Sequence, residues 1–169
     1  MAVPAMRRLG VLVVCALLLS SVPQSHAGEL APDWQLRGLD GRTYELAELK
    51  GKAVVLSFWA TWCAPCRIET KWLAEMHRQY HAQGLQIVGI SMDEASDDAE
   101  VARFVAKYQV PYTILLRGQT IADRYGGIRY LPQMFFIDRA GRIVKSTHGI
   151  HDRAELEAEV QQLTGSPSQ

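Results

Sequence analysis

The sequence predicts a single α/β domain, in which a mixed central β-sheet is covered by helices on both faces. Apolar runs typical of buried strands alternate along the chain with stretches whose apolar residues recur at helical spacing. The last two strand patterns are joined by a short turn, which predicts an antiparallel pair at one edge of the sheet. Such alternation of strands and helices is typical of layered α/β folds.

The N-terminal part predicts a hairpin and two buried strands. Residues 35–39 and residues 43–46 alternate in polarity on either side of the turn signal Asp40-Gly41, so we expect a short β-hairpin that caps the domain. The continuous apolar runs at residues 53–58 and residues 85–91 contain β-branched side chains. Such runs predict strands that are covered on both faces.

Two helices are expected in the middle of the chain. The first lies between the two buried strands, ends at Gly84 and carries apolar residues at four-residue steps: Ile68, Trp72, Met76 and Tyr80. The second covers residues 97–108, with Asp97 and Glu100 as a capping box. One acidic cluster is interpreted as a solvated loop and helix start: Asp93, Glu94, Asp97 and Asp98.

The C-terminal part predicts three further strands and a last helix. A short strand at residues 112–116 is followed by an irregular, glycine-containing segment at residues 117–131. Apolar residues 134–138 and residues 142–145 predict a hairpin around a tight turn. The last helix covers residues 152–163, and Asp152 and Glu155 form its expected capping box.

Length and charge limit the possible functions. The 169 residues fit one domain, and apolar residues make up 48% of the chain. The 18 basic and 18 acidic side chains cancel, which removes any electrostatic argument for a nucleic-acid partner. We expect a monomer that binds no nucleic acid.

The first residues predict a targeting segment. Arg7 and Arg8 precede an apolar run at residues 9–19, and Ser25-His26-Ala27 places small residues where a signal peptidase cleaves. The run is shorter than the roughly twenty residues that span a bilayer. We therefore expect a signal peptide at residues 1–27, a mature domain at residues 28–169 and a periplasmic or otherwise extracytoplasmic location. An uncleaved membrane anchor is the alternative.

Cys63 and Cys66 carry the predicted chemistry. They follow a buried strand and begin a helix, where free backbone N–H groups and the helix dipole favour a thiolate. A disulfide across so short a loop adds little stability, so redox chemistry or metal binding explains the pair better than a structural role. Pro65 costs no hydrogen bond in the first helical turn. Trp62 can shield the pair and offer a docking surface.

The surrounding residues resemble the thioredoxin superfamily. The string from Phe58 to Arg67, Phe-Trp-Ala-Thr-Trp-Cys-Ala-Pro-Cys-Arg, is similar to the active site of extracytoplasmic thiol–disulfide oxidoreductases of the TlpA/ResA type. Pro32-Asp33-Trp34 resembles the N-terminal hairpin of that group. Pro132, with the apolar strand after it, resembles its cis-proline segment. The resemblance covers nearly the whole mature chain and implies a thioredoxin fold.

The resemblance assigns roles to five residues. Cys63 would be the exposed attacking thiolate, and Cys66 the buried resolving thiol. Pro132 would be cis and pack against the disulfide, and the backbone of Leu131 would bind a substrate segment. Glu69, three residues after Cys66, lies where ResA-like members carry an acid, one helical turn from that cysteine. It is our candidate for proton transfer.

The resemblance also implies partners. The substrates would be disulfides of other proteins, and a membrane electron donor of the reducing type would regenerate the dithiol. Cytochrome c maturation is one implied context, because the apocytochrome disulfide must be reduced before haem attachment. We expect no cofactor and no metal. The direction of electron flow depends on the reduction potential, and the oxidising direction stays open.

Departures from the family pattern include Ser57 and the pair Gln133-Met134. Ser57 stands where thioredoxins carry a buried aspartate and TlpA/ResA proteins often have asparagine. A serine hydroxyl cannot act as a base near pH 7, which strengthens the case for Glu69. Gln133-Met134 replaces the usual hydroxyl residues after the cis-proline, which leaves the choice of substrate open.

Other functions fit the sequence less well than disulfide exchange. The two thiolates could hold Cu(I) as a chaperone-like module, although the spacing of known copper chaperones is longer. A peroxidase needs a Thr-x-x-Cys setting, which Thr61-Trp62-Cys63 does not provide. His77 and His81 have zinc-ligand spacing but no third ligand nearby in the sequence, so a solvated face is favoured. His148 and His151 are interpreted as surface residues near the last helix.

Overall fold

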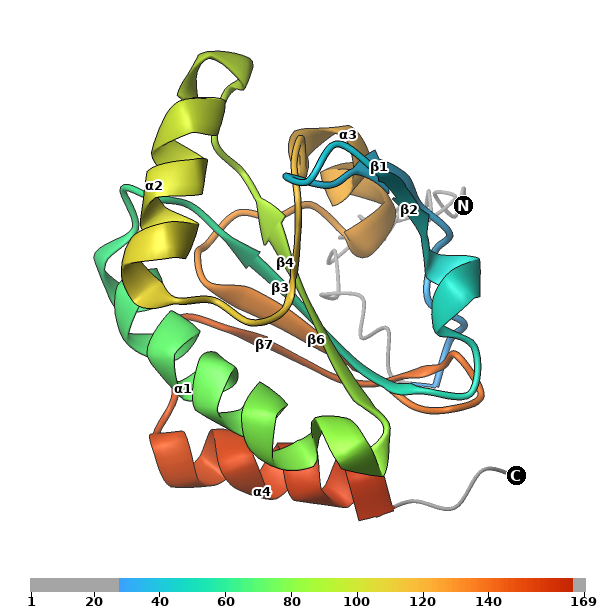
Figure 1. The fold of residues 1–169 in the computed structure, drawn as a ribbon. Helices are drawn as coiled ribbons and strands as arrows, with labels where there is room; N and C mark the ends of the chain where they lie inside the picture. Colours follow the sequence, from blue (N-terminus) through green and yellow to red (C-terminus); the bar gives the residue numbers. More distant parts are fainter. Residues whose placement is uncertain (1–27, 166–169) are drawn as a thin grey trace, which may run out of the picture.

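The computed structural model describes residues 28–165, and the predicted signal peptide at residues 1–27 lies outside this range (Figure 1). The strands are β1 (Gln35–Arg37), β2 (Thr43–Glu45), β3 (Ala53–Trp59), β4 (Leu85–Ser91), β5 (Thr113–Leu115), β6 (Gln133–Ile137) and β7 (Ile143–His148). The α-helices are α1 (Ala64–Tyr80), α2 (Asp98–Tyr108), α3 (Gln119–Ala122) and α4 (Arg153–Gly165).

Five strands form a mixed sheet in the order β5-β4-β3-β6-β7. Strands β3, β4 and β5 run parallel, whereas β6 and β7 pair antiparallel at the other side. Strands β1 and β2 form a separate antiparallel pair ahead of this sheet, as the turn signal Asp40-Gly41 predicts. The predicted mixed sheet, its antiparallel edge and the N-terminal strand pair are confirmed.

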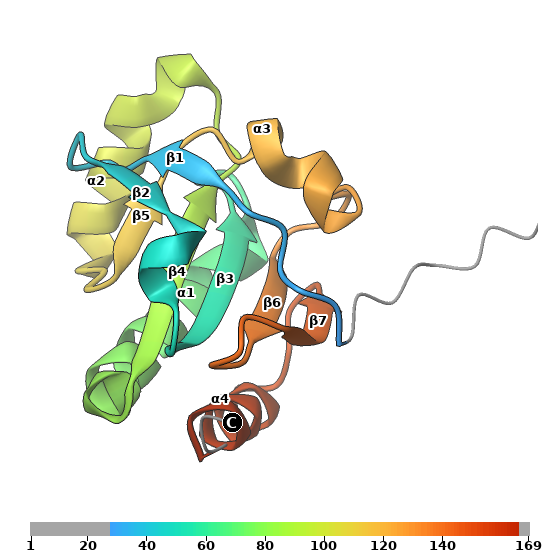
Figure 2. The same ribbon diagram turned by 90° about the vertical axis from the view of Figure 1, so that its right-hand side faces the viewer.

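The side chains of β3 alternate between two apolar layers. Val55 and Trp59 pack in one layer with residues of α1, α2 and α4. Leu56 and Phe58 pack in the other layer with β1, α3 and the 3₁₀ turn η4 (Asp123–Tyr125). Figures 1 and 2 show the long helices on one side of the sheet and the β1–β2 pair with α3 on the other. Strand β3 is therefore buried on both faces along its whole length.

Three details differ from the sequence-based prediction. Residues 117–131 contain a four-residue helix, α3, and the turn η4, where we predicted irregular structure. Ile68 is exposed, so the predicted apolar stripe of α1 is wrong at its first position, and Glu69 is buried instead. The predicted capping box of α2 does not form within the described chain, because the Asp97 side chain caps no backbone N–H group. Glu100 pairs with Arg103 instead.

The start of the last helix agrees better with the sequence-based prediction than the start of α2 does. The Asp152 carboxylate accepts a hydrogen bond from the Ala154 backbone N–H at 2.7 Å, which is the N-cap half of the expected box. No helix in residues 28–165 is both long and apolar enough to cross a membrane.

Candidate active site

The two cysteines form a disulfide at the junction of β3 and α1. Three residues separate the end of β3 from Cys63, which is the N-cap residue of α1. The Cys63 and Cys66 sulfurs are 2.08 Å apart, and the Cys66 backbone N–H donates a hydrogen bond to Cys63 Sγ at 3.2 Å. Pro65 occupies the first turn, where its missing N–H has no helical partner. After reduction, the same N–H group and the helix dipole would stabilise a thiolate on Cys63.

The two sulfurs differ in access. Cys63 is 5% exposed and lines a surface groove of about 560 Å³, whereas Cys66 is 1% exposed and is not among the described residues that line the groove. The prediction of an exposed Cys63 is therefore wrong for the disulfide form, because the surrounding residues shield most of its surface. An attacking sulfur can reach Cys63 only through the groove.

Three loops at one end of the sheet form the groove. Trp62 and Pro65 contribute from the start of α1, and Leu131 contributes from the segment before β6. The other described residues that line it are Ala64 from the start of α1, Met92 and Glu94 from the loop after β4, Gln119 of α3, and Ile128 and Arg129 from the segment before β6. The Leu131–Pro132 peptide is cis, as the resemblance implies, and Pro132 is buried.

Two large apolar side chains protrude beside this site. Trp62 is 66% exposed next to Cys63, and Tyr130 is 67% exposed next to Leu131. Exposed aromatic residues are enriched at protein–protein contacts, because they bury a large area when a partner covers them. Sequence reasoning missed Tyr130, although its place two residues before Pro132 was a usable signal.

Glu69 lies one turn after Cys66 on the buried side of α1, with 1% of its surface exposed. Its Oε1 accepts a hydrogen bond from the His151 backbone N–H at 3.1 Å, and His151 Nδ1 lies 3.5 Å from the same oxygen. Burial raises the pKa of Glu69, although its contacts with His151 oppose that shift. His151 lies in the loop before α4, as predicted, but it is only partly exposed, since its backbone and ring both contact a buried carboxyl group.

Replacing Glu69 with glutamine is expected to stabilise the protein at alkaline pH. Because the pKa of Glu69 is higher in the folded state than its ordinary value near 4.5, folding favours the protonated form. The wild-type protein therefore loses stability as the pH rises through the raised pKa, whereas Glu69→Gln does not. Urea unfolding between pH 4 and pH 9 should show an advantage for Glu69→Gln that grows with pH.

The matched control is Glu75→Gln, which changes an exposed carboxylate on the same helix. The control should follow the wild-type pH dependence. Parallel stability curves for wild type and Glu69→Gln would contradict the raised pKa of Glu69.

Asp93 is a second buried carboxylate, with 2% of its surface exposed. It accepts hydrogen bonds from the Thr61 backbone N–H at 3.1 Å, from the Thr61 hydroxyl at 2.6 Å and from the Ser91 hydroxyl at 2.8 Å. Assigning Asp93 to a solvated acidic loop is therefore wrong. Because Thr61 lies two residues before Cys63, this carboxylate holds the loop that carries the attacking cysteine.

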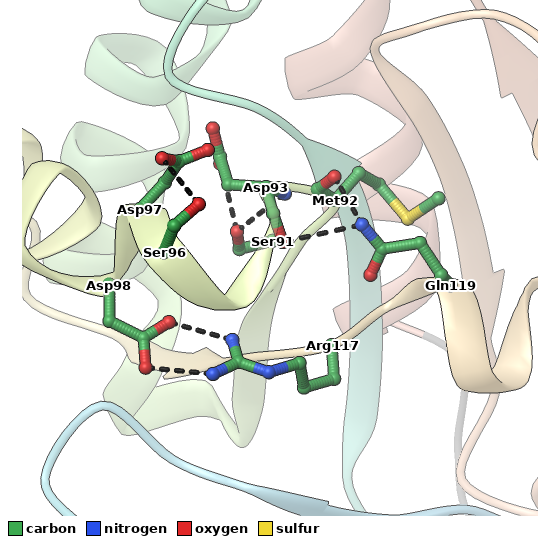
Figure 3. A network of polar contacts seen from close by, with 8 residues as sticks. All are labelled: Ser91, Met92, Asp93, Ser96, Asp97, Asp98, Arg117 and Gln119. Carbon is green, nitrogen blue, oxygen red and sulfur yellow. Dashed lines mark hydrogen bonds and ion pairs between the residues drawn. The ribbon is translucent and has the colours of Figure 1, made fainter.

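Figure 3 shows the polar contacts of the loop after β4 and of the start of α2 with the segment that leads into α3. Gln119 donates a hydrogen bond to the Met92 carbonyl at 2.5 Å, next to Asp93. Arg117 forms a bidentate ion pair with Asp98, with distances of 2.6 and 2.8 Å, and this pair lowers the pKa of Asp98. The loop after β4 is thereby attached to Thr61 through Asp93 and to α3 through Gln119, so polar contacts join two walls of the groove.

Ser57 is buried in β3, paired with Gly89 on one side and Met134 on the other. Its side chain points to the layer that contains the cysteines, since it alternates with Phe58 of the opposite layer. Because the Ser57 hydroxyl is neutral, β3 supplies no acid at this position. The acidic side chain nearest to Cys66 along α1 is Glu69.

The described residues contain no group of three metal-ligating side chains that could hold an ion. The rings of His77 and His81 lie side by side, with centroids 4.7 Å apart. Burial lowers the pKa of His77, which keeps this ring neutral near pH 7.

The fold and the groove-facing cysteine pair define a thiol–disulfide oxidoreductase of the thioredoxin fold. The chain belongs to the AhpC/TSA family, whose model matches residues 27–146. It is 35% identical over 138 residues to the thiol-disulfide oxidoreductase ResA of Bacillus thuringiensis (strain Al Hakam), covering 81% of this chain and 78% of that protein.

Solved structures agree with this assignment. A thiol:disulfide interchange protein of the thioredoxin family from Chlorobium tepidum superposes with a TM-score of 0.74 at 26% identity, covering 84% of this chain and all of that one. A secreted Mycobacterium tuberculosis disulfide oxidoreductase, homologous to E. coli DsbE, superposes with a TM-score of 0.69 at 26% identity, covering 77% and 96% of the two chains. The predicted fold and family are confirmed.

Proposed function

We propose that this protein is an extracytoplasmic disulfide reductase that passes two electrons from Cys63 and Cys66 to disulfides of other proteins. The observation that supports the proposal most strongly is that the Cys63 sulfur is accessible from the groove and the Cys66 sulfur is not. Cys63 lines the groove beside Leu131. Cys66 is buried, and the buried Glu69 follows it by one turn of α1. A substrate sulfur can reach only Cys63, and only Cys66 can resolve the product.

The reaction follows from this arrangement. The Cys63 thiolate attacks one sulfur of the substrate disulfide, forms a mixed disulfide and releases the other substrate sulfur as a thiolate. Cys66 then loses its proton and attacks Cys63 Sγ. The Cys63–Cys66 bond forms, the bond to the substrate breaks, and the substrate leaves as a dithiol once its thiolates take up protons. Two electrons have moved from the protein to the substrate.

Two buried carboxylates favour the reducing direction. The Asp93 carboxylate accepts hydrogen bonds from Thr61 and Ser91, and it lies against the loop that carries Cys63. Its negative charge, and that of Glu69 when ionised, opposes thiolate formation at the helix start. A dithiol whose thiolate is less stabilised is a stronger reductant, because a stabilised reduced form makes an oxidant.

The predicted signal peptide supports an extracytoplasmic site of action. A membrane electron donor would then return the Cys63–Cys66 disulfide to the dithiol, and proteins of cytochrome c maturation are one class of substrate that fits this role. The exposed Trp62 and Tyr130 beside the groove would contact the substrate protein.

Reduction of insulin disulfides under dithiothreitol tests the activity. The mature protein, residues 28–169, should accelerate insulin precipitation, and a Cys63→Ser, Cys66→Ser double variant should not. Stoichiometric Cu(I) binding without insulin reduction would favour the copper-chaperone alternative, and peroxide consumption without it would favour a peroxidase.

A further inference from the structure

We propose that His151 is the proton relay between solvent and Glu69, so that the buried resolving thiol can release its proton during turnover. This inference rests on the proposed disulfide exchange. It assigns a role to a side chain outside the cysteine motif, at the N-terminal end of α4.

The need for a relay follows from burial. Cys66 must lose a proton before it can attack the mixed disulfide, but it is 1% exposed. Glu69 is one helical turn away and can accept that proton, but it is also 1% exposed. Both groups are therefore shielded from water, and a proton that reaches Glu69 needs a further acceptor.

His151 is placed to be that acceptor. Its Nδ1 lies 3.5 Å from Glu69 Oε1, and its side chain is 24% exposed. The imidazole therefore contacts the buried carboxyl group on one side and reaches solvent with another part of the ring. Histidine is suited to this task, because its pKa lies near neutral pH.

Two buried atoms of the pair are left unsatisfied. Glu69 Oε2 and His151 Nδ1 have no hydrogen-bond partner among residues 28–165. Buried polar atoms are normally paired, and an exception calls for an explanation, of which a catalytic role is one. The separation between Nδ1 and Oε1 is longer than a hydrogen bond but short enough for one to form with a small rotation of the ring.

The other charged groups around the pair leave this route open. On the Glu69 side, the Tyr112 hydroxyl is buried and its pKa is raised, so it stays protonated near pH 7 and takes up no proton. On the side of His151, Glu155, Lys145 and Glu159 line the same cavity of about 330 Å³. Lys145 and Glu159 form an ion pair with each other, and Glu155 is exposed.

Substitution of His151 can separate the relay from the structural contact. The hydrogen bond to Glu69 Oε1 comes from the backbone N–H, so His151→Gln keeps it and removes only the imidazole ring. The control is His81→Gln, which removes an exposed imidazole at the opposite end of α1.

The experiment follows the two chemical steps separately. The reduced mature protein is mixed with excess cystine between pH 5 and pH 9, quenched with acid and analysed by mass spectrometry. The mixed disulfide on Cys63 should form at the wild-type rate in His151→Gln, but its resolution by Cys66 should slow at least about tenfold, because a proton acceptor is lost. The pH midpoint of resolution should rise, since a protonated His151 no longer lowers the pKa of Glu69.

Added imidazole decides between a relay and a packing role. Resolution by His151→Gln should recover in millimolar imidazole, whereas wild type and His81→Gln should not respond. Wild-type rates and midpoint in His151→Gln, or slow resolution that imidazole does not restore, would overturn the relay. Absence of both the mixed disulfide and the Cys63–Cys66 disulfide after exposure of the wild-type protein to cystine would instead contradict the proposed function itself.

Discussion

Replacing Cys66 with serine is expected to stop turnover and to leave the substrate attached to Cys63. The serine hydroxyl cannot resolve the mixed disulfide, and release then depends on slow attack by external dithiothreitol, so insulin reduction should fall by a factor on the order of 10³. Non-reducing electrophoresis should show a covalent complex between Cys66→Ser and an insulin chain, which dithiothreitol releases.

Cys63→Ser is the matched control for this trap. It should lose turnover to the same extent, but it should form no complex, because the remaining thiol is 1% exposed. A complex with Cys63→Ser and none with Cys66→Ser would reverse the order of attack. Full activity in either variant would exclude the two-cysteine cycle.

Removing the Asp93 carboxylate is expected to cost more stability than removing any other acidic side chain near the groove. Asp93→Ala leaves the Thr61 N–H, the Thr61 hydroxyl and the Ser91 hydroxyl without their acceptor in a buried place. Because the substitution removes hydrogen bonds to a charged group and leaves buried donors unpaired, we expect a loss of about 3 kcal/mol in the free energy of unfolding. Urea denaturation of the oxidised protein measures this loss.

Glu94→Ala provides the control, since it removes the same charge from the adjacent, exposed position. Its free energy of unfolding should stay within about 0.5 kcal/mol of wild type. Asp93→Ala should also reduce insulin more slowly, because the loop that carries Cys63 loses its anchor. An Asp93→Ala protein as stable as Glu94→Ala would show that Asp93 is a solvated residue after all.

The strands and the cysteine motif were predictable because their signals are local. Continuous apolar runs predict β3 and β4 to within a residue, and Gly84 ends the helical region after α1 in a left-handed conformation. The junction of Cys63 with a helix start follows from Pro65 and the spacing of the pair. Helix α3 was not predicted, because four residues are too few to show a helical period.

The polar part of the site depends on contacts between distant segments, which a single sequence does not reveal. Apolar spacing placed Ile68 on the buried face of α1, but the end of this helix beside the disulfide buries Glu69 instead. His151, 82 residues further along the chain, supplies the N–H group that Glu69 accepts. Asp93 and Thr61 are likewise 32 residues apart. The sequence around Asp93 shows only a cluster of acidic residues, which does not indicate that Thr61 is its partner.

The reduction potential of the Cys63–Cys66 pair tests the central claim most directly. The mature protein is equilibrated in dithiothreitol buffers of graded ratio, and its free thiols are counted after acid quenching and alkylation. We expect one two-electron transition at a reducing potential, closer to the value of about −270 mV for thioredoxin than to the value of about −120 mV for DsbA. A potential near the oxidising value, or no two-electron transition at all, would contradict the assignment of this protein as a disulfide reductase.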